Sequence, residues 1–501
     1  MSTLNATDAN FLYAETDTCP MSIASVQYMQ LPDQVSATDF VTSLQAFLQQ
    51  RLHLVPYLTS IPQWTDGVIG HPNWVTVPDF DITQHVYSVP VPAPAGRRQV
   101  EQIVARLHES TLPRTRPLWD LVVLTGLPNN QVAYYNRVHH ACIDGVSAQA
   151  STALLMDKEP DQADTKTAIP AGDRHTESAA EHFFNFLAAA ATQAVQATTL
   201  APQRMQALGE LAQRTLHPTK GLGALTQPVP ASVLNGSVDR SRTYAMGEIP
   251  LKEAKNLAKS TNSSLNDIFL NICGGALRRY LVRHGACPEQ SLIAGCPVSL
   301  RQPGDHSNDN QVTMMKVDLG TDVDDTILRL GKVRSSARIA KEVTATMAPL
   351  LPRSITLPGL GAMTHNLAEV ANYLPLAEWL GNAPFNVLIS NVPGPRQVLY
   401  SNGARMLTHY PVSIPAHGIG VNITCQSYVD RLYFGVTACA RTMPDADLLR
   451  DDIEYEWDNL HAALTADVVK LPKSSEDEVA PRPIAPPAAT KNVEDNDQQV
   501  A

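Results

Sequence analysis

The chain has 501 residues, of which 44% are apolar and 17% are charged, so it contains enough apolar side chains for a large core. This composition excludes a chain that is disordered throughout. The formal net charge of −11 argues against nucleic acid as the main ligand, because phosphate binding depends on Lys and Arg.

Periodic apolar patterns predict a mixed α/β region in the first 155 residues. Spacings typical of one helical face occur at Phe40–Leu48, with Thr38 or Asp39 as the cap, and at Val100–Leu107. Two strands joined by a turn are expected between residues 121 and 138. Further strands and turns are expected around them, so this region combines both kinds of element.

The sequence divides into four segments. Residues 1–156 form an N-terminal half, and residues 157–235 form a linker that is polar at first and then rich in Ala and Gln, with connecting helices. Residues 236–470 form a second half, and residues 471–501 form a tail that we expect to be disordered. Within the linker, Phe183–Leu187 predicts a connecting helix, and a helix lying on a lipid surface is the open alternative.

The second half is predicted to contain two helices followed by five strands. The helices are expected at residues 251–260 and directly after Ser263 or Ser264, which would cap the second one. Short apolar runs predict the strands at residues 291–298, 312–317, 387–390, 418–424 and 431–437.

Cysteine usage and the N-terminus bear on the cellular setting. The seven cysteines are scattered without C-x-x-C spacing, which predicts neither a disulfide framework nor a zinc site and indicates a reducing, cytosolic environment. The first ten residues contain no Lys or Arg and do not resemble a secretory signal. No window of 18 residues is continuously apolar, so we expect any membrane contact to be peripheral.

The segment His139-His140-Ala141-Cys142-Ile143-Asp144-Gly145 follows the second predicted strand. A neutral imidazole, whose ordinary pKa is about 6.5, can act as a general base. A carboxylate one turn away can accept backbone N–H groups or pair with a basic residue, and glycine allows close approach of the backbone. The same spacing also fits two polar histidines at a strand end and an Asp that caps the next helix, so both interpretations are open.

Motifs of several other catalytic classes do not occur in the sequence. It contains no H-E-x-x-H, no G-x-S-x-G and no G-x-x-x-x-G-K-[ST] segment. Cys142 lies beside Ile143, and we interpret it as a packing residue rather than as a nucleophile. Because His409 and His417 have no partner at metal-site spacing, we expect no metal site.

The His139–Gly145 segment resembles the HHxxxDG motif of CoA-dependent acyltransferases. Six further segments resemble elements of one branch, the bacterial wax ester synthase/diacylglycerol acyltransferase (WS/DGAT) family, and they occur in the same order between residues 5 and 465. These segments are Asp8–Glu15 with Pro20-Met21, Pro117–Trp119, Leu234–Gly236 with Arg240–Tyr244, Ser264–Asp267 with Ala276–Leu281, Pro297–Arg301, and Asn386–Pro395. The set is more specific than HHxxxDG alone, which condensation domains of non-ribosomal peptide synthesis share.

The resemblance implies an α/β (α+β) fold of two chloramphenicol-acetyltransferase-like halves, with the motif at a central tunnel where they join and a disordered C-terminal tail. It also implies transfer of an acyl group from acyl-CoA to an alcohol, by direct attack on the thioester. In this scheme His140 is the general base, His139 orients the loop and Asp144 has a structural role. The backbone N–H of Gly145 and the side chain of Asn266 are the candidate donors to the oxyanion.

The remaining candidates are residues of the matched segments that would border the substrate tunnel. They are Glu15, Asp267, Arg301, Asn391, Pro393 and Gly394. Each also has a structural interpretation: Asp267 is suited to cap a helix, and Asn391–Pro395 has the composition of a rigid turn. Arg278, Arg279 and Arg301 are either contacts for CoA phosphates or parts of a solvated face.

The implied substrates are a long-chain acyl-CoA and an alcohol, either a fatty alcohol that yields a wax ester or diacylglycerol that yields triacylglycerol. Acyl-CoA is itself a substrate, so no cofactor is expected. The expected location is cytoplasmic, at the inner face of the membrane or at lipid inclusions. Two alternatives are open: a condensation-type enzyme that takes its acyl group from a carrier protein, and a non-catalytic lipid-droplet protein of the same fold.

Overall fold

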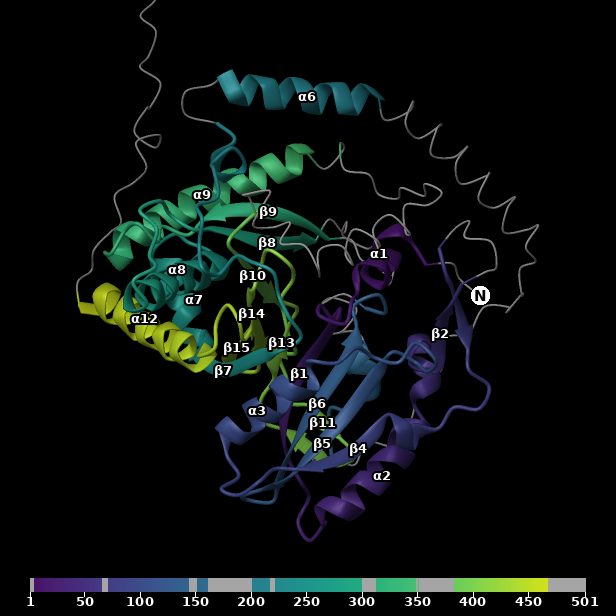
Figure 1. The fold of residues 1–501 in the computed structure, drawn as a ribbon. Coiled ribbons are helices and arrows are strands. Elements are labelled where there is room, and N and C mark those ends of the chain that lie inside the picture. The colour runs from purple at the N-terminus through teal and green to yellow at the C-terminus, as the bar shows by residue number, and fades with distance from the viewer. Residues whose placement is uncertain are drawn as a thin grey trace, which may run out of the picture.

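Two mixed β-sheets with helices packed against them make up the structure, which is a computed structural model (Figure 1). The structure describes residues 4–64, 71–143, 151–160, 201–216, 221–299, 312–347, 350 and 383–466. The predicted tail, most of the predicted linker and the Phe183–Leu187 cluster lie outside these residues. The α/β class expected from the sequence is confirmed.

The first sheet is built mainly from the N-terminal part of the chain. Its strands, in spatial order, are β11 (Tyr400–Ser401), β12 (Ala404–Met406), β1 (Ser22–Gln30), β6 (Gln131–His139), β5 (Trp119–Leu127) and β4 (Val86–Pro90), and β13 (Tyr410–Val412) also pairs with β1. The other elements of this part are α1 (Ala6–Ala14), α2 (Ala37–Gln49), α3 (Arg97–Leu107), the short helices η1 (Leu52–Leu54), η2 (Pro56–Thr59) and η3 (Ile82–Gln84), and a separate hairpin of β2 (Ser60–Gln63) and β3 (Asn73–Thr76).

The second sheet carries a layer of helices on one face (Figure 1). Its strands, in spatial order, are β7 (Arg242–Pro250), β15 (Arg431–Cys439), β14 (Val421–Tyr428), β10 (Val387–Val392), β8 (Ile293–Ser299) and β9 (Val312–Asp318). The helices are α7 (Leu251–Ser260), α8 (Leu265–Arg283), α9 (Thr326–Met347) and α12 (Ala446–Ala466), with α6 (Ala201–Leu216) packed on α9 and η4 (Gly223–Leu225) close to β9.

Local sequence signals explain several of these boundaries. The apolar face predicted at Phe40–Leu48 is the buried face of α2, but the cap is Ser36, whose side chain accepts the N–H of Asp39, so the predicted caps Thr38 and Asp39 are wrong. Ser264 caps α8 in a reciprocal capping box with Asp267. The five strands predicted in the second half are all present, with boundaries that shift by at most four residues.

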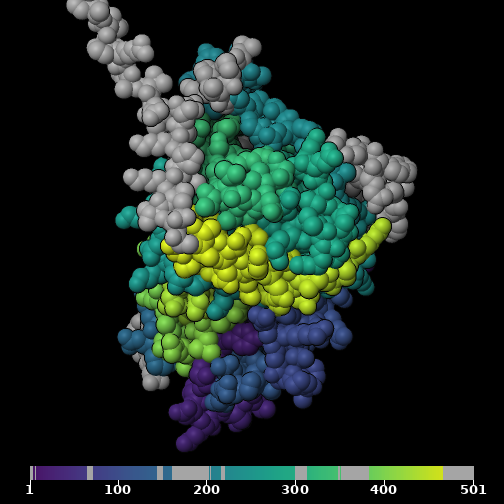
Figure 2. Space-filling view, turned by 90° about the vertical axis from the view of Figure 1, so that its left-hand side faces the viewer, coloured from purple at the N-terminus to yellow at the C-terminus, as the bar shows by residue number. Residues whose placement is uncertain are grey.

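A segment from late in the chain connects the two sheets. The sequence assigns residues 400–412 to the second half, yet β11, β12 and β13 extend the first sheet, and Val412 and Pro411 lie opposite Ala24 and Ser25 of β1. Figure 2 shows light-green residues of the C-terminal part lying against purple and blue residues of the N-terminal part. On the other side, Gly435 of β15 lies so close to the Pro411 carbonyl that a Cβ atom would not fit. The two halves are therefore interleaved.

Within the described residues, no helix is long and apolar enough to cross a membrane.

Candidate active site

The double histidine lies where β6 ends, held on both sides by backbone hydrogen bonds. The His139 N–H donates to the carbonyl of Leu118 at 3.0 Å, and the His140 N–H donates to the carbonyl of Met21 at 2.8 Å. Successive side chains of a strand point to opposite faces, so the two rings have different surroundings. His139 is fully buried, whereas His140 is half-buried and lines a cavity.

The buried ring of His139 is held at both nitrogens. Its Nδ1 accepts the N–H of Ala141 at 3.0 Å, and its Nε2 lies 3.3 Å from Oε1 of Glu15. Because Nδ1 is an acceptor, the proton of the neutral ring is on Nε2 and faces the carboxylate. The ring of His139 is therefore fixed behind the cavity wall, and its role in orienting the loop stays a prediction.

Glu15 follows α1 and connects several parts of the site. It accepts the N–H of Met21 at 3.1 Å through Oε1, and Arg114 lies 3.3 Å from its Oε2. Burial raises the pKa of Glu15, but the contact with His139, the Met21 N–H and the charge of Arg114 together hold this pKa below its ordinary value. Glu15 was predicted to border the tunnel; the structure instead places it behind His139, where it is a buried carboxylate.

The ring of His140 stacks on Phe11, a residue that the sequence analysis did not select. The ring centroids are 4.0 Å apart and the planes differ by 9°. Phe11 belongs to α1 and also lines the cavity. The available signal was its position inside the Asp8–Glu15 segment, which matches the start of the family pattern. The stack fixes the plane of the imidazole while leaving one edge on the cavity side.

The cavity lies between the two sheets and has a volume of about 700 Å³. Its walls include Val138 of β6, His140 directly after β6, Ile23 of β1, and Ser390 and Thr424 of the second sheet. Most of the lining residues are apolar, and about half of the polar ones come from β1, β6, β10 and β14. The arrangement suits a long aliphatic substrate that meets an imidazole at one point of the wall.

Two of the predicted tunnel residues line this cavity. Asn391 and Pro393, at the end of β10 and just after it, are both part of the wall. Gly394 follows them, donates its N–H to Oγ of Ser427 at 3.1 Å, and lies too close to the Ser427 carbonyl for any side chain. The segment is therefore a rigid turn, as its composition predicts, and it also forms part of the cavity wall.

The Pro117–Trp119 segment holds the histidines in place and contributes no reacting group. Leu118 is buried and accepts the His139 N–H, while the Trp119 indole donates to the carbonyl of Leu58 at 2.9 Å. The Trp119 ring also lines the cavity. This segment therefore acts as a packing corner, and it contributes one aromatic side chain to the cavity wall.

The other candidates are less directly connected to the cavity. Asp267 caps α8, and its side chain accepts the N–H of Ser264 at 2.8 Å. Asn266 lies in the first turn of α8 and is not among the described residues that line the cavity, so the structure does not bring it to His140 as an oxyanion donor. Asp144, Gly145 and Arg301 lie outside the described residues, and their predicted roles are not tested here.

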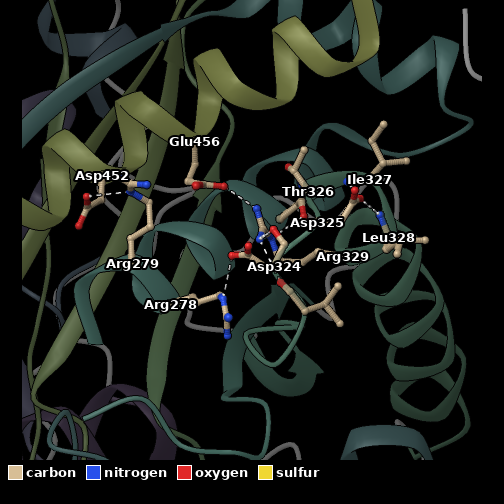
Figure 3. Close-up of polar contacts among 12 residues, drawn as sticks. Arg278, Arg279, Asp324, Asp325, Thr326, Ile327, Leu328, Arg329, Asp452 and Glu456 are labelled. Carbon is tan, nitrogen blue, oxygen red and sulfur yellow. Dashed lines mark hydrogen bonds and ion pairs between the residues drawn. The ribbon is translucent and has the colours of Figure 1, made fainter. Parts of the chain in front are cut away.

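The remaining polar groups fit structural roles. Burial raises the pKa of the Cys142 thiol well above its ordinary value, which disfavours a thiolate nucleophile. Arg278 and Arg279 pair with Asp324 and Asp452 in the second half, away from the residues that line the cavity (Figure 3). Across the described ranges, no three His, Cys, Asp or Glu side chains gather in a metal-binding arrangement.

We expect Glu15→Ala to lower kcat with little change in KM. The substitution removes the carboxylate that lies 3.3 Å from the fully buried Nε2 of His139. Loss of such a polar partner costs about 1–3 kcal/mol, or roughly 5- to 150-fold. Glu15→Gln keeps an acceptor oxygen and should restore most of the activity. Steady-state kinetics of both variants check this, with Asp17→Ala as a matched control because Asp17 is an exposed carboxylate nearby. Equal kcat for Glu15→Ala and Asp17→Ala would contradict the assignment.

The fold is shared by solved structures of an acyltransferase and of condensation domains. The starter condensation domain of rhizomide synthetase RzmA, solved with C8-CoA, matches with a TM-score of 0.54 and 14% identity, covering 93% of this chain and 95% of that chain. A wax ester synthase/diacylglycerol acyltransferase from Marinobacter aquaeolei VT8 matches with a TM-score of 0.65 and 26% identity, covering 93% of this chain and 100% of that chain.

Sequence comparisons define the family among the proteins that share this fold. The family model described as wax ester synthase/diacylglycerol acyltransferase catalytic domain matches residues 4–269, and the WS/DGAT C-terminal domain matches residues 309–461. A protein of Mycobacterium tuberculosis H37Rv named as a candidate diacylglycerol O-acyltransferase is 33% identical over 459 residues, covering 91% of this chain and 99% of the relative. The chain therefore belongs to the WS/DGAT family and is an acyltransferase.

Proposed function

We propose that this enzyme transfers a long-chain fatty acyl group from acyl-CoA to the hydroxyl of a fatty alcohol, of diacylglycerol, or of both. The observation that carries the proposal is the half-buried His140 ring, which stacks on Phe11 and lines a mostly apolar cavity of about 700 Å³. A neutral imidazole in such a cavity can reach a hydroxyl while the aliphatic chains are held away from water.

In the proposed reaction, His140 removes the proton from the acceptor hydroxyl as the alcohol oxygen attacks the thioester carbon. The C–O bond forms and a tetrahedral oxyanion develops, which requires hydrogen-bond donors. The backbone N–H of Gly145 is the proposed donor. Collapse of the oxyanion breaks the C–S bond, and the proton held by His140 passes to the CoA thiolate. Atoms and charge balance without a covalent acyl-enzyme and without a cofactor.

The apolar lining supports a long-chain substrate rather than a short one. An acyl chain of about 15 methylenes gains on the order of 12 kcal/mol on leaving water, at about 0.8 kcal/mol for each methylene. Because both lipid substrates and the ester product partition into membranes and lipid inclusions, we propose that the enzyme works at the cytoplasmic surface of one of these. His139 and Asp144 are proposed to position the loop that carries the base.

Incubation of the full chain with palmitoyl-CoA and either hexadecanol or diolein, followed by thin-layer analysis of the lipids, tests the proposal. We expect a wax ester from hexadecanol, triacylglycerol from diolein, or both, with release of CoA thiol in equal amount. Ester from a carrier-bound acyl group but not from acyl-CoA would indicate a condensation-type enzyme, whose fold this chain shares. No ester from either donor would indicate a non-catalytic lipid-binding protein.

A further inference from the structure

The cavity that contains His140 has a second polar region further along the same wall. Strands β1 and β6 pair Ile23 with Val138, then Ser25 with Asn136, then Gln27 with Tyr134, and all six residues line the cavity. The backbone N–H of His140 is hydrogen-bonded to the carbonyl of Met21, so these two residues lie at the same level along the strand direction. At about 3.3 Å per residue along a strand, Ser25 and Gln27 lie roughly 13 Å and 20 Å from that level.

His409, just before β13, completes this polar region, which we call the distal polar patch: Ser25, Gln27 and His409. The Gln27 side-chain amide donates to Oγ of Ser25 at 3.2 Å and to Nε2 of His409 at 3.3 Å. Because Nε2 of His409 is then an acceptor, its ring proton is on Nδ1. Gln27 and His409 are both buried, with 3% and 5% of their surface exposed.

The His409 Nδ1 atom is buried, and none of the described residues supplies it with a hydrogen-bond partner. Burial lowers the pKa of His409 to about 4, so the ring is neutral at physiological pH and presents an N–H rather than a positive charge. A buried N–H without an acceptor is unfavourable, and the side chain lines a cavity that is suited to aliphatic substrates. A neutral oxygen atom of a bound molecule is an acceptor that suits this N–H in a largely apolar cavity.

We propose that the distal polar patch binds a hydroxyl or carbonyl oxygen carried within, or at the far end of, a long aliphatic substrate whose reacting group is at His140. This inference rests on the proposed function. A C–C bond of about 1.5 Å advances an extended chain by about 1.3 Å, so the oxygen would be roughly ten to sixteen carbons from the reacting end. The oxygenated chain belongs either to the acyl donor or to the acceptor alcohol.

The test compares matched plain and oxygenated substrates in two arms. The donor arm uses stearoyl-CoA and 12-hydroxystearoyl-CoA with hexadecanol, and the acceptor arm uses dodecanol and 1,12-dodecanediol with palmitoyl-CoA. We expect kcat/KM to favour the oxygenated substrate by about tenfold in one arm, which identifies its source. His409→Phe, which removes the donor at similar volume, should reduce this ratio to about one or below.

Two further variants keep the test decisive. Gln27→Leu removes the amide that orients His409 and should lower the same ratio, so the proposal stays testable if His409→Phe does not fold. His461→Phe, at a half-exposed position of α12, should leave the ratio unchanged. Equal kcat/KM for plain and oxygenated substrates in both arms, or a preference that survives both patch variants, would overturn the proposal. Failure of the proposed function would be distinguished from failure of this inference, because the plain substrates would then give no ester.

Discussion

His140→Ala is expected to lower kcat by about 100- to 10,000-fold, the usual contribution of a positioned general base. The His140 ring is the imidazole of the double histidine that lines the cavity, whereas the His139 ring is buried against Glu15. Removing a half-buried side chain that faces a cavity should leave the backbone bonds of His140 and Met21 intact. Release of CoA from palmitoyl-CoA, measured with the preferred alcohol, checks the result.

The matched control for this substitution is His461→Ala. His461 lies on α12, and its Nε2 is 3.7 Å from Glu253. Both variants should melt within a few degrees of the unmodified chain, and the control should keep its full kcat. A His140→Ala variant that is folded and turns over at the original rate would eliminate His140 as the base.

Glu456→Ala is expected to cause the largest loss of stability, about 3–5 kcal/mol, because it leaves a buried guanidinium without its carboxylate. Arg329 is 1% exposed, and it pairs with Glu456 of α12 in the interior of the second half (Figure 3). Its Nε also donates to Oδ1 of Asn271 at 3.1 Å, so the cation is held in one orientation. A charge buried in this way cannot be resolvated by a small shift of the side chain.

Thermal melting and urea unfolding of Glu456→Ala measure this loss. Asp324→Ala is the control, because Asp324 pairs with Arg278 in the same region but its side chain is 91% exposed, and exposed pairs contribute little. The pairing partners can be followed in Figure 3. Similar shifts for the two variants would show that burial of the Arg329–Glu456 pair does not matter for stability.

Local patterns predicted a large part of the fold. The helical face of α2, the cap of α8 at Ser264 and the strands that lead to His139 each depend on residues close together in the sequence, and each was found. The short strands β11 to β13 contain only two or three residues each, which is too few for a period to be visible. Their pairing with β1 depends on the tertiary structure, so the sequence assigned them to the other half.

The candidate site shows the same division between local and long-range information. The position of the histidines at a strand end and the turn at Asn391–Pro395 follow from local sequence. The Phe11 stack and the Glu15 contact join α1 to residues more than 120 positions away, and composition does not encode such a pairing. His409 was set aside because it had no metal-site partner. Only the register of β13 on β1 brings it to Gln27.

The contacts of β13 restrict how a substrate can enter the cavity. This strand pairs with β1 on one side, and on the other Tyr244 donates to the Pro411 carbonyl at 3.1 Å and the Ser413 N–H donates to Thr437 at 3.1 Å. A motion that separated the two sheets would have to break either the pairing of β13 with β1 or the hydrogen bonds of Tyr244 and Ser413. Long lipid substrates must then enter the cavity lengthwise while the two sheets stay together. They would not enter through a gap between the sheets that opens and closes in each turnover.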